Sequence, residues 1–307
     1  MNKSFTLIEI LVVIVVIGIL SAFVLVGINS ITNNANIAKS KAFSESLRNS
    51  LLTSLVSEWK LDGNANDSWG VSNGTWSGPT GANTTVNYRP SSECISGQCL
   101  DFDGTDDVVN FGNNASLSMG NNDHTVSIWI KFDNALAPQT ETLFACGAGC
   151  GALPNCGGYW IRRLSGQNRL YAGFTDSQAS QSEGYLSGIG TLINDIWYNI
   201  IVRFDRDGLV QSYINGQLQT GYSFNISSRQ LFVSNFKSLT IGAWSASDSR
   251  LDGKIDEPKL YHSIVSSQLI NQEYYSGINK LLVNSEINND GFKQRLTELK
   301  SNLAIHE

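Results

Sequence analysis

An apolar run of 24 residues, from Phe5 to Ile28, constrains this chain more than any other feature. Only Thr6, Glu9 and Ser21 are polar within it. As a helix it would extend ~36 Å at about 1.5 Å per residue, which is enough to cross a hydrocarbon core of ~30 Å. A lone carboxylate carried towards the centre of a bilayer costs ~2.5–3.5 kcal/mol. The run therefore predicts a transmembrane helix, and Glu9 indicates a partner inside the membrane.

The residues around this run carry a family resemblance. Met1-Asn2-Lys3-Ser4, followed by Phe5-Thr6-Leu7-Ile8-Glu9, resembles the leader and mature start of type IV pilins and type II secretion pseudopilins. An ordinary secretory signal has a shorter apolar region of ~7–15 residues with its cleavage site after it, whereas here the motif comes first. The family usually has Gly before the cut, where this chain has Ser4, and many members have Pro late in the helix, where this chain has Val26.

The resemblance implies roles for three residues. Residues 1–4 would be a leader that a prepilin peptidase removes by cutting between Ser4 and Phe5. Phe5 would then be N-methylated, and Glu9 would neutralise the terminal amine of a neighbouring subunit during assembly. The chain would cross the cytoplasmic membrane once, with its N-terminus inside, and would pass after assembly to an extracellular filament or the cell surface.

Residues 29–56 continue the helical pattern. Their apolar positions include Ile37, Phe43, Leu47, Leu51 and Leu55, and these 28 residues contain neither Pro nor Gly. This spacing predicts an amphipathic helix that continues the apolar run, giving one stalk of ~50 residues and ~75 Å.

Composition limits the partners of the remaining chain. The formal net charge is −6, and the 21 Lys and Arg residues form no basic stripe of the kind that binds phosphates. Nucleic acid is therefore not an expected partner. The low charged fraction of 16% and the 28 Gly residues favour an exported β protein with many turns.

All five cysteines follow the apolar run, in the part that would be exported, and this placement favours disulfides. Cys94 and Cys99 bracket a Ser-Gly turn and are predicted to form a local disulfide. Cys146, Cys150 and Cys156 leave one thiol over. We expect Cys150 and Cys156 to be in disulfides, with the pairing of these last three cysteines open.

From Trp59 onwards, short alternating runs are separated by Gly, Asn and Asp. In Thr125–Phe132, for example, Val126, Ile128, Ile130 and Phe132 share one face of a strand. Asp207-Gly208 supplies a hairpin turn between two further runs. Regular strands with turn signals between them predict an all-β sandwich.

An ordered set of motifs over residues 57–263 resembles a laminin-G-like, concanavalin A-like jelly roll. These motifs are Trp59-Lys-Leu-Asp-Gly-Asn-Ala-Asn-Asp-Ser68, Leu100-Asp-Phe-Asp-Gly-Thr-Asp-Asp107, His124-Thr-Val-Ser-Ile-Trp129, Tyr213-Ile-Asn-Gly216 and Gly253-Lys-Ile-Asp-Glu257. The resemblance implies two stacked, curved antiparallel sheets and a glycan or a protein as ligand. After this domain, residues 264–307 are predicted to form a short helical hairpin, capped by Ser266 and broken near Gly291.

The resemblance also implies one structural calcium ion near the meeting point of the first and last strands. By motif, its ligands would be Asp62, Asn64, Asp67 and Asp256. A second acidic turn contains Asp103, Asp106 and Asp107. The alternative is that these Asp and Asn residues simply cap turns, as they do in most β proteins.

Sugars bind to aromatic rings combined with planar polar side chains. Six aromatic residues could serve if they are exposed: Trp69, Trp76, Tyr88, Trp160, Tyr171 and Trp244. Packing in the sandwich is the alternative for each of them, and we expect Trp129 and Trp197 to be structural. The chain has no closely spaced set of carboxylates typical of a glycosidase and no nucleophile motif, so no catalytic residue is predicted.

These features predict an N-terminal transmembrane helical stalk, an all-β jelly-roll head and a C-terminal helical hairpin. The predicted function is that of a structural, non-enzymatic subunit of a type IV pilus-like filament whose head adheres to a glycan or a protein. The alternatives are a pseudopilin of a type II secretion-like machine and a membrane-anchored lectin that does not polymerise. The expected partners are other pilin-like subunits, the membrane, a prepilin peptidase and an extracellular glycan or protein.

Overall fold

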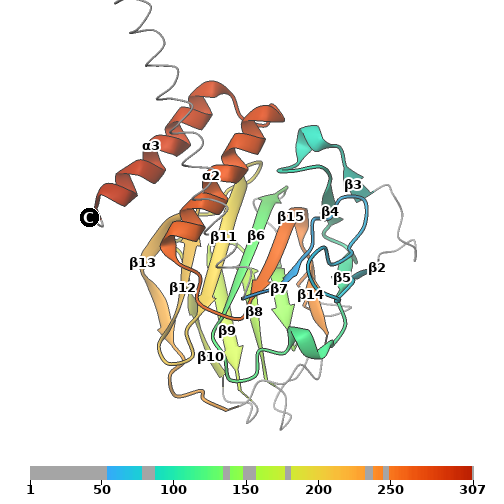
Figure 1. Ribbon diagram of the computed structural model, residues 1–307, viewed down its shortest axis with the longest axis vertical. Coiled ribbons are helices and arrows are strands. Elements are labelled where there is room, and N and C mark those ends of the chain that lie inside the picture. The colour runs from blue at the N-terminus through green and yellow to red at the C-terminus, as the bar shows by residue number, and fades with distance from the viewer. Residues whose placement is uncertain are drawn as a thin grey trace, which may run out of the picture. The chain divides into compact units, whose positions relative to one another are not determined.

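The computed structural model describes residues 54–305, except for 78–86, 134–138, 148–156, 177–180, 232–237 and 245–248. The leader, the transmembrane helix and nearly all of the amphipathic helix predicted above lie outside these described residues. The amphipathic helix is predicted to end at residue 56, but Leu55 and Val56 belong to a strand, Leu55–Glu58, which pairs with the last strand of the larger sheet. Ser54–Glu307 form one compact unit, which we call the head (Figure 1).

Two antiparallel sheets make up most of the head. The larger sheet has the strand order β13, β12, β11, β6, β15, β4, β3, with β1 paired to β15, and the smaller has the order β10, β9, β8, β7, β14, β5, β2. The larger sheet contains β1 (Leu55–Glu58), β3 (Tyr88–Arg89), β4 (Cys99–Asp103), β6 (His124–Phe132), β11 (Trp197–Phe204), β12 (Leu209–Ile214), β13 (Gln217–Asn225) and β15 (Asp252–Tyr261). The smaller sheet contains β2 (Thr75–Ser77), β5 (Val108–Asn110), β7 (Glu141–Cys146), β8 (Gly158–Arg163), β9 (Leu170–Thr175), β10 (Gln181–Tyr185) and β14 (Leu239–Ile241). The predicted all-β sandwich is confirmed.

The main hydrophobic core lies between the two sheets. The predicted inward face of β6 is correct, because Val126, Ile128, Ile130 and Phe132 are all fully buried in this core. The predicted hairpin is also confirmed: β11 pairs with β12, and the amide of Gly208 donates to the carbonyl oxygen of Asp205 at 3.1 Å.

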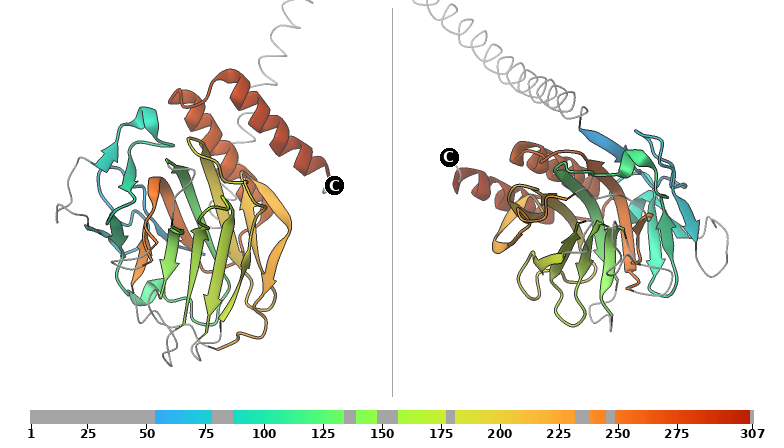
Figure 2. Two further views of the ribbon diagram at one scale, coloured as in Figure 1. Left: turned by 180° about the vertical axis from the view of Figure 1, so that it is seen from behind. Right: turned by 90° about the horizontal axis from the view of Figure 1, so that it is seen from below.

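Two helices follow the last strand, as predicted. Helix α2 spans Ser267–Val283 and α3 spans Asn289–Ile305. Ser266 caps α2, since its hydroxyl oxygen accepts a hydrogen bond from the amide of Leu269 at 3.3 Å. The helices form a hairpin on the outer side of the larger sheet (Figures 1 and 2).

A second hydrophobic core lies between these helices and the larger sheet. Trp129 of β6 and Trp197 of β11 are buried there against Tyr274 and Ile278 of α2. A Cβ atom at Gly277 would lie 2.0 Å from Cζ2 of Trp129. The helix approaches the sheet this closely because residue 277 has no side chain. Trp129 and Trp197 are therefore structural, as expected.

Polar residues on the outer faces of β6 and β15 also contact α2. The carboxylate of Glu273 accepts hydrogen bonds from the hydroxyls of Ser127 at 2.9 Å and Tyr261 at 2.7 Å, and from Nζ of Lys259 at 3.2 Å. Burial raises the pKa of Glu273, but these contacts, and the charge of Lys259 above all, outweigh it and hold the pKa below its usual range. The second core is therefore formed jointly by the helices and the larger sheet. A head that ends at residue 263 would lack the helices and would expose this core to water.

The predicted disulfide between Cys94 and Cys99 is confirmed. Both sulfurs are fully buried in the second core. The loop that the disulfide closes is also held from outside: Asn284, which follows α2, donates to the carbonyl oxygen of Cys94 at 3.1 Å, and Trp197 Nε1 donates to that of Glu93 at 3.2 Å. The disulfide therefore stabilises the surface on which the helices pack.

We expect Glu273→Leu to lower the free energy of unfolding of the 54–307 head by about 2–3 kcal/mol, because among the described residues it leaves the ammonium of Lys259 with one ion-pair partner, Glu58 at 3.6 Å. The double change Glu273→Leu/Lys259→Met should recover at least half of that loss, since it removes both charges. Glu298→Leu, on the exposed face of α3, is the matched control and should stay within ~0.5 kcal/mol of the wild type. Urea unfolding measures all three. Equal effects at positions 273 and 298 would contradict this account of helix docking.

The buried His124 should make the stability of the head depend on pH. Its ring is fully buried, stacks on Phe204 with centroids 4.4 Å apart, and has its pKa lowered well below 6.5 by burial. The unfolded chain therefore binds a proton that the head does not, so the contribution of His124 to stability is present above pH 6.5 and is lost as the pH falls. In urea unfolding, His124→Phe should gain about 1.4 kcal/mol per pH unit over the wild type below pH 6.5. Measurements at pH 8 give the packing difference alone, and a pH-independent difference would refute the assignment.

Candidate functional site

The outward face of the smaller sheet gathers aromatic and planar polar side chains. In the register of β8, β9 and β10, Arg162 lies opposite Tyr171, which lies opposite Tyr185. The neighbouring row contains Trp160 opposite Gly173. Because side chains alternate between the two faces of a strand, these residues point away from the core while Tyr159, Ile161 and Phe174 point into it. We call Trp160, Arg162, Tyr171, Tyr185 and Trp244 the aromatic surface.

Trp160 forms the base of this surface. A Cβ atom at Gly173 would lie 2.0 Å from Cζ2 of Trp160, so the indole lies over the glycine on the neighbouring strand. The ring of Trp244 stands edge-on to Trp160, with centroids 5.2 Å apart. The guanidinium carbon of Arg162 lies 4.1 Å from the centroid of Trp244. This stacking holds the half-exposed Trp244 and Arg162 in place.

Two tyrosines extend the surface across the sheet. The rings of Tyr171 and Tyr185 are 5.9 Å apart, and 45% of Tyr185 is exposed. Burial, followed by a hydrogen bond with Glu183, raises the pKa of Tyr171, so its hydroxyl stays protonated at neutral pH. At the sheet edge, the guanidinium carbon of Arg169 lies 3.5 Å from the centroid of Tyr185 and 5.8 Å from that of Tyr222 on β13. The surface thus offers one exposed ring, Tyr185, and two partly exposed rings, Tyr171 and Trp244, bordered by hydrogen-bonding groups.

The structure separates the six aromatic candidates. Trp160, Tyr171 and Trp244 come together on the outward face of the smaller sheet, although Trp160 itself is only 7% exposed, whereas Trp76 and Tyr88 are buried in the main core. Trp69 is 43% exposed elsewhere, where its indole nitrogen donates to the carbonyl oxygen of Leu55 at 2.9 Å. Arg162 and Tyr185 were not among the candidates that the sequence suggested. The alternation of residues in Gly158–Arg163 and in Gln181–Tyr185 indicates that they lie on one face of their strands, but no local pattern indicates that these strands lie in one sheet.

The four residues expected to bind calcium do not form a convergent site. Both carboxylate oxygens of Asp67 accept hydrogen bonds from backbone amides of its own turn, including those of Gly70 at 2.7 Å and Ser72 at 3.0 Å. The side-chain oxygen of Asn64 accepts from the amide of Asn66 at 2.9 Å. These two residues organise a turn, which is the alternative that the sequence left open.

Asp62 and Asp256 approach the same disulfide-closed loop by different routes. Asp256 is fully buried, and its Oδ2 accepts from the amides of Ile95 at 2.8 Å and Ser96 at 3.0 Å. Oδ1 of Asp62 accepts from the amide of Gln98 at 2.6 Å. Burial, with the negative charges of Glu257 and Asp62 nearby, raises the pKa of Asp256 well above its usual range. Oδ1 of Asp256 has no hydrogen-bond partner among the described residues. In the described part of the chain, however, the acids of this expected set do not form a group whose carboxylate oxygens lie within 4.8 Å of one another.

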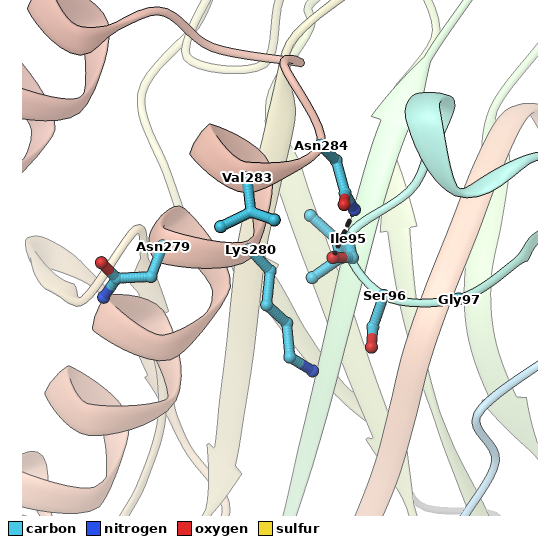
Figure 3. A pocket seen from close by; sticks show the side chains of 7 residues that line it. All are labelled: Ile95, Ser96, Gly97, Asn279, Lys280, Val283 and Asn284. Carbon is cyan, nitrogen blue, oxygen red and sulfur yellow. Dashed lines mark hydrogen bonds between the residues drawn. The ribbon is translucent and has the colours of Figure 1, made fainter.

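A pocket of about 230 Å³ lies beside this loop (Figure 3). It is lined by Ile95, Ser96, Gly97, Asn279, Lys280, Val283 and Asn284. Asn284 is already engaged, since its amide nitrogen donates to the carbonyl oxygens of Cys94 and Ile95 at 3.1 and 3.2 Å. Lys280 lies 3.4 Å from a carboxylate oxygen of Glu257. Ligand sites usually have ~300–1,000 Å³, so the aromatic surface is the better candidate.

Of the remaining residues predicted to have a role, Cys146 is described by the structure and the others are not. Cys146 is a buried thiol whose pKa is raised to about 12 by burial. Cys150 and Cys156, like Ser4, Phe5 and Glu9, lie outside the described residues. Within the described part of the chain, no helix combines the length and apolar character needed to cross a membrane.

Comparison with solved structures gives several similar folds. The receptor binding domain of botulinum neurotoxin D has a TM-score of 0.54 and 19% identity, covering 74% of this chain and 54% of that one. The ligand binding domain of the same serotype, in complex with N-acetylneuraminic acid, has a TM-score of 0.54 and 17% identity, covering 76% and 53%. Domain 4 of AbnA, a GH43 extracellular arabinanase from Geobacillus stearothermophilus, in complex with arabinotriose, has a TM-score of 0.52 and 21% identity, covering 71% and 96%.

These identities are low, so the likeness shows the fold alone, and this chain spans about half the length of the neurotoxin domains. No curated protein sequence matches the chain. Residues 1–25 match the prokaryotic N-terminal methylation motif. Residues 103–271, more than half of the 307, match the concanavalin A-like lectin/glucanases family, and the two stacked sheets agree with that match. The chain belongs to the concanavalin A-like lectin/glucanases superfamily and begins with a prepilin-type methylation motif.

Proposed function

We propose that this protein is a non-enzymatic subunit of a type IV pilus-like filament whose head binds an extracellular glycan through the aromatic surface. The observation that carries the proposal is the stack of Trp160, Trp244 and Arg162, continued by Tyr171 and Tyr185. Ring faces contact the apolar face of a sugar, while guanidinium and hydroxyl groups can bond to its hydroxyls.

The dimensions of the surface favour a chain of sugars over a single one. Arg162, Tyr171 and Tyr185 lie on three neighbouring strands, which together span ~10 Å at about 4.8 Å per strand. Trp244 adds a further half-exposed ring beside Arg162. An oligosaccharide lying across the strands would contact several of these groups at once.

The chemistry of this face favours binding over hydrolysis. On the described strands, Glu183 is the one carboxylate in the outward rows of β8, β9 and β10, and it bonds with the hydroxyl of Tyr171. Glycosidases of this general kind need two carboxylates on either side of the bond that is cleaved, ~5–10 Å apart. The structures of the arabinanase domain and the neurotoxin domain, each with a bound carbohydrate, support a carbohydrate ligand.

The methylation motif supports assembly through the N-terminus. Residues 1–25 match it, and Glu9 lies within the apolar run that follows the leader. In the proposed filament, Glu9 pairs with the methylated amine of a neighbouring Phe5, and the prepilin peptidase produces that amine by cutting after Ser4. The head, which forms a compact unit of its own, is then displayed outside the cell.

Two tyrosines of equal exposure test the aromatic surface. Tyr185 is 45% exposed on it, and Tyr275 is 46% exposed on α2. On a glycan array, we expect the 54–307 head to bind at least one class of oligosaccharide. Tyr185→Ala should weaken that binding about tenfold, equivalent to ~1.4 kcal/mol, while Tyr275→Ala should leave it unchanged. Binding that is lost in the Tyr275 variant, or that survives in both, would place the ligand elsewhere. A head that binds no glycan would favour the secretion pseudopilin.

Substitutions inside the apolar run test whether the protein assembles into filaments through Glu9. Glu9→Ala should abolish recovery of filaments from the cell surface while the protein stays in the membrane, because the carboxylate that neutralises the neighbouring amine is missing. Ser21→Ala removes another polar group from the same run and should leave filaments intact. Sedimentation of sheared surface material gives the readout. Equal amounts of filament from wild type and Glu9→Ala would instead favour an anchored lectin that does not polymerise.

A further inference from the structure

The turn between β4 and β5 brings three carboxylates together. Asp103, Asp106 and Asp107 each place one carboxylate oxygen within 4.8 Å of the others. The turn is short because Gly104 adopts a φ of +75°, and the side chain of Asp103 accepts a hydrogen bond from the amide of Thr105 at 2.8 Å. These bonds explain the shape of the turn but leave the charge of three neighbouring carboxylates unbalanced.

Two carboxylate oxygens of this turn are buried and have no hydrogen-bond donor among the described residues. Asp107 is only 2% exposed, and its Oδ2 accepts from the amide of Asp103 at 3.0 Å and from the side chain of Asn87 at 3.4 Å. Its Oδ1 has no such partner, and neither has Oδ1 of Asp106. Burying a carboxylate oxygen without a donor or a cation is costly. This is an observation separate from the grouping of the acids, and it indicates that a positive ligand completes the turn.

The neighbouring strand adds negative charge. Asp252 of β15 lies directly opposite Asp103 in the register of β4 and β15. The nearby guanidinium of Arg250 donates to the main-chain oxygen of Asp107 at 3.4 Å. Among the described residues, four carboxylates and one guanidinium thus lie at or beside this turn.

We propose that Asp103, Asp106 and Asp107 bind a calcium ion. Calcium takes six to eight oxygen ligands at about 2.3–2.6 Å from carboxylates, main-chain carbonyls and water. The three side chains can supply the carboxylates, and Oδ1 of Asp106 and of Asp107 are two such oxygens. The proposal places the calcium ion at a different turn from Asp62, Asn64, Asp67 and Asp256, whose acids do not form such a close group among the described residues. It is independent of the glycan proposal, since it involves no residue of the aromatic surface.

Calcium titration of the full chain in detergent micelles tests the proposal. After treatment with a chelator, isothermal titration calorimetry should show one bound calcium per chain, and the thermal midpoint should rise when calcium is added. Asp106→Asn keeps the size of a half-exposed side chain and should weaken calcium binding at least tenfold. Asp107→Asn should weaken it further.

The matched control is Asp62→Asn, on the other acidic turn, which should bind calcium as the wild type does. Since Asp107→Asn disturbs a buried turn, a loss of folding in that variant would leave Asp106→Asn as the deciding measurement. Absence of calcium binding at millimolar concentration would overturn the proposal. So would binding that is unchanged in Asp106→Asn or lost in Asp62→Asn, because the ion would then lie elsewhere.

Discussion

Strand β6 is buried on both of its faces, and the rest of the head depends on how the two faces are covered. Val126, Ile128 and their neighbours face the smaller sheet, whereas Trp129 and Ser127 face α2. A strand in that position needs apolar partners on one side and matched polar partners on the other. Helix α2 supplies both, through the contact of Gly277 with Trp129 and through the carboxylate of Glu273. The C-terminal helices are thus part of the folding unit.

This arrangement leaves the outward face of the smaller sheet to carry function. The helices cover the larger sheet, so an exposed row of rings can form on the smaller one (Figure 2). The aromatic surface there is organised from below: Gly173 makes room for Trp160, which in turn supports Trp244 and Arg162. A rigid platform of this kind loses little conformational freedom when a ligand binds, which favours affinity.

Local patterns predicted much of the fold. The alternation in Thr125–Phe132, the turn at Asp207-Gly208 and the cap at Ser266 each depend on neighbours within a few residues, and each has the predicted structure. The site was predictable only in part. Trp160, Tyr171 and Trp244 were among six candidates, but nothing local distinguishes them from Trp76 and Tyr88, which are buried. The same holds for the acidic residues: their spacing along the chain does not reveal which carboxylate oxygens lie close together in space.

By itself, the sequence determined the apolar N-terminal run with its methylation motif, the strands and turns of a sandwich, and the two final helices. Periodicity and capping specify these elements, because both operate over short separations along the chain. Only the tertiary structure decided which strands are neighbours, that Arg162, Tyr171 and Tyr185 form one row, and that Oδ1 of Asp106 and Oδ1 of Asp107 are buried without donors among the described residues. Those outcomes depend on strand register and on the packing of distant segments, which fix where each side chain points in space.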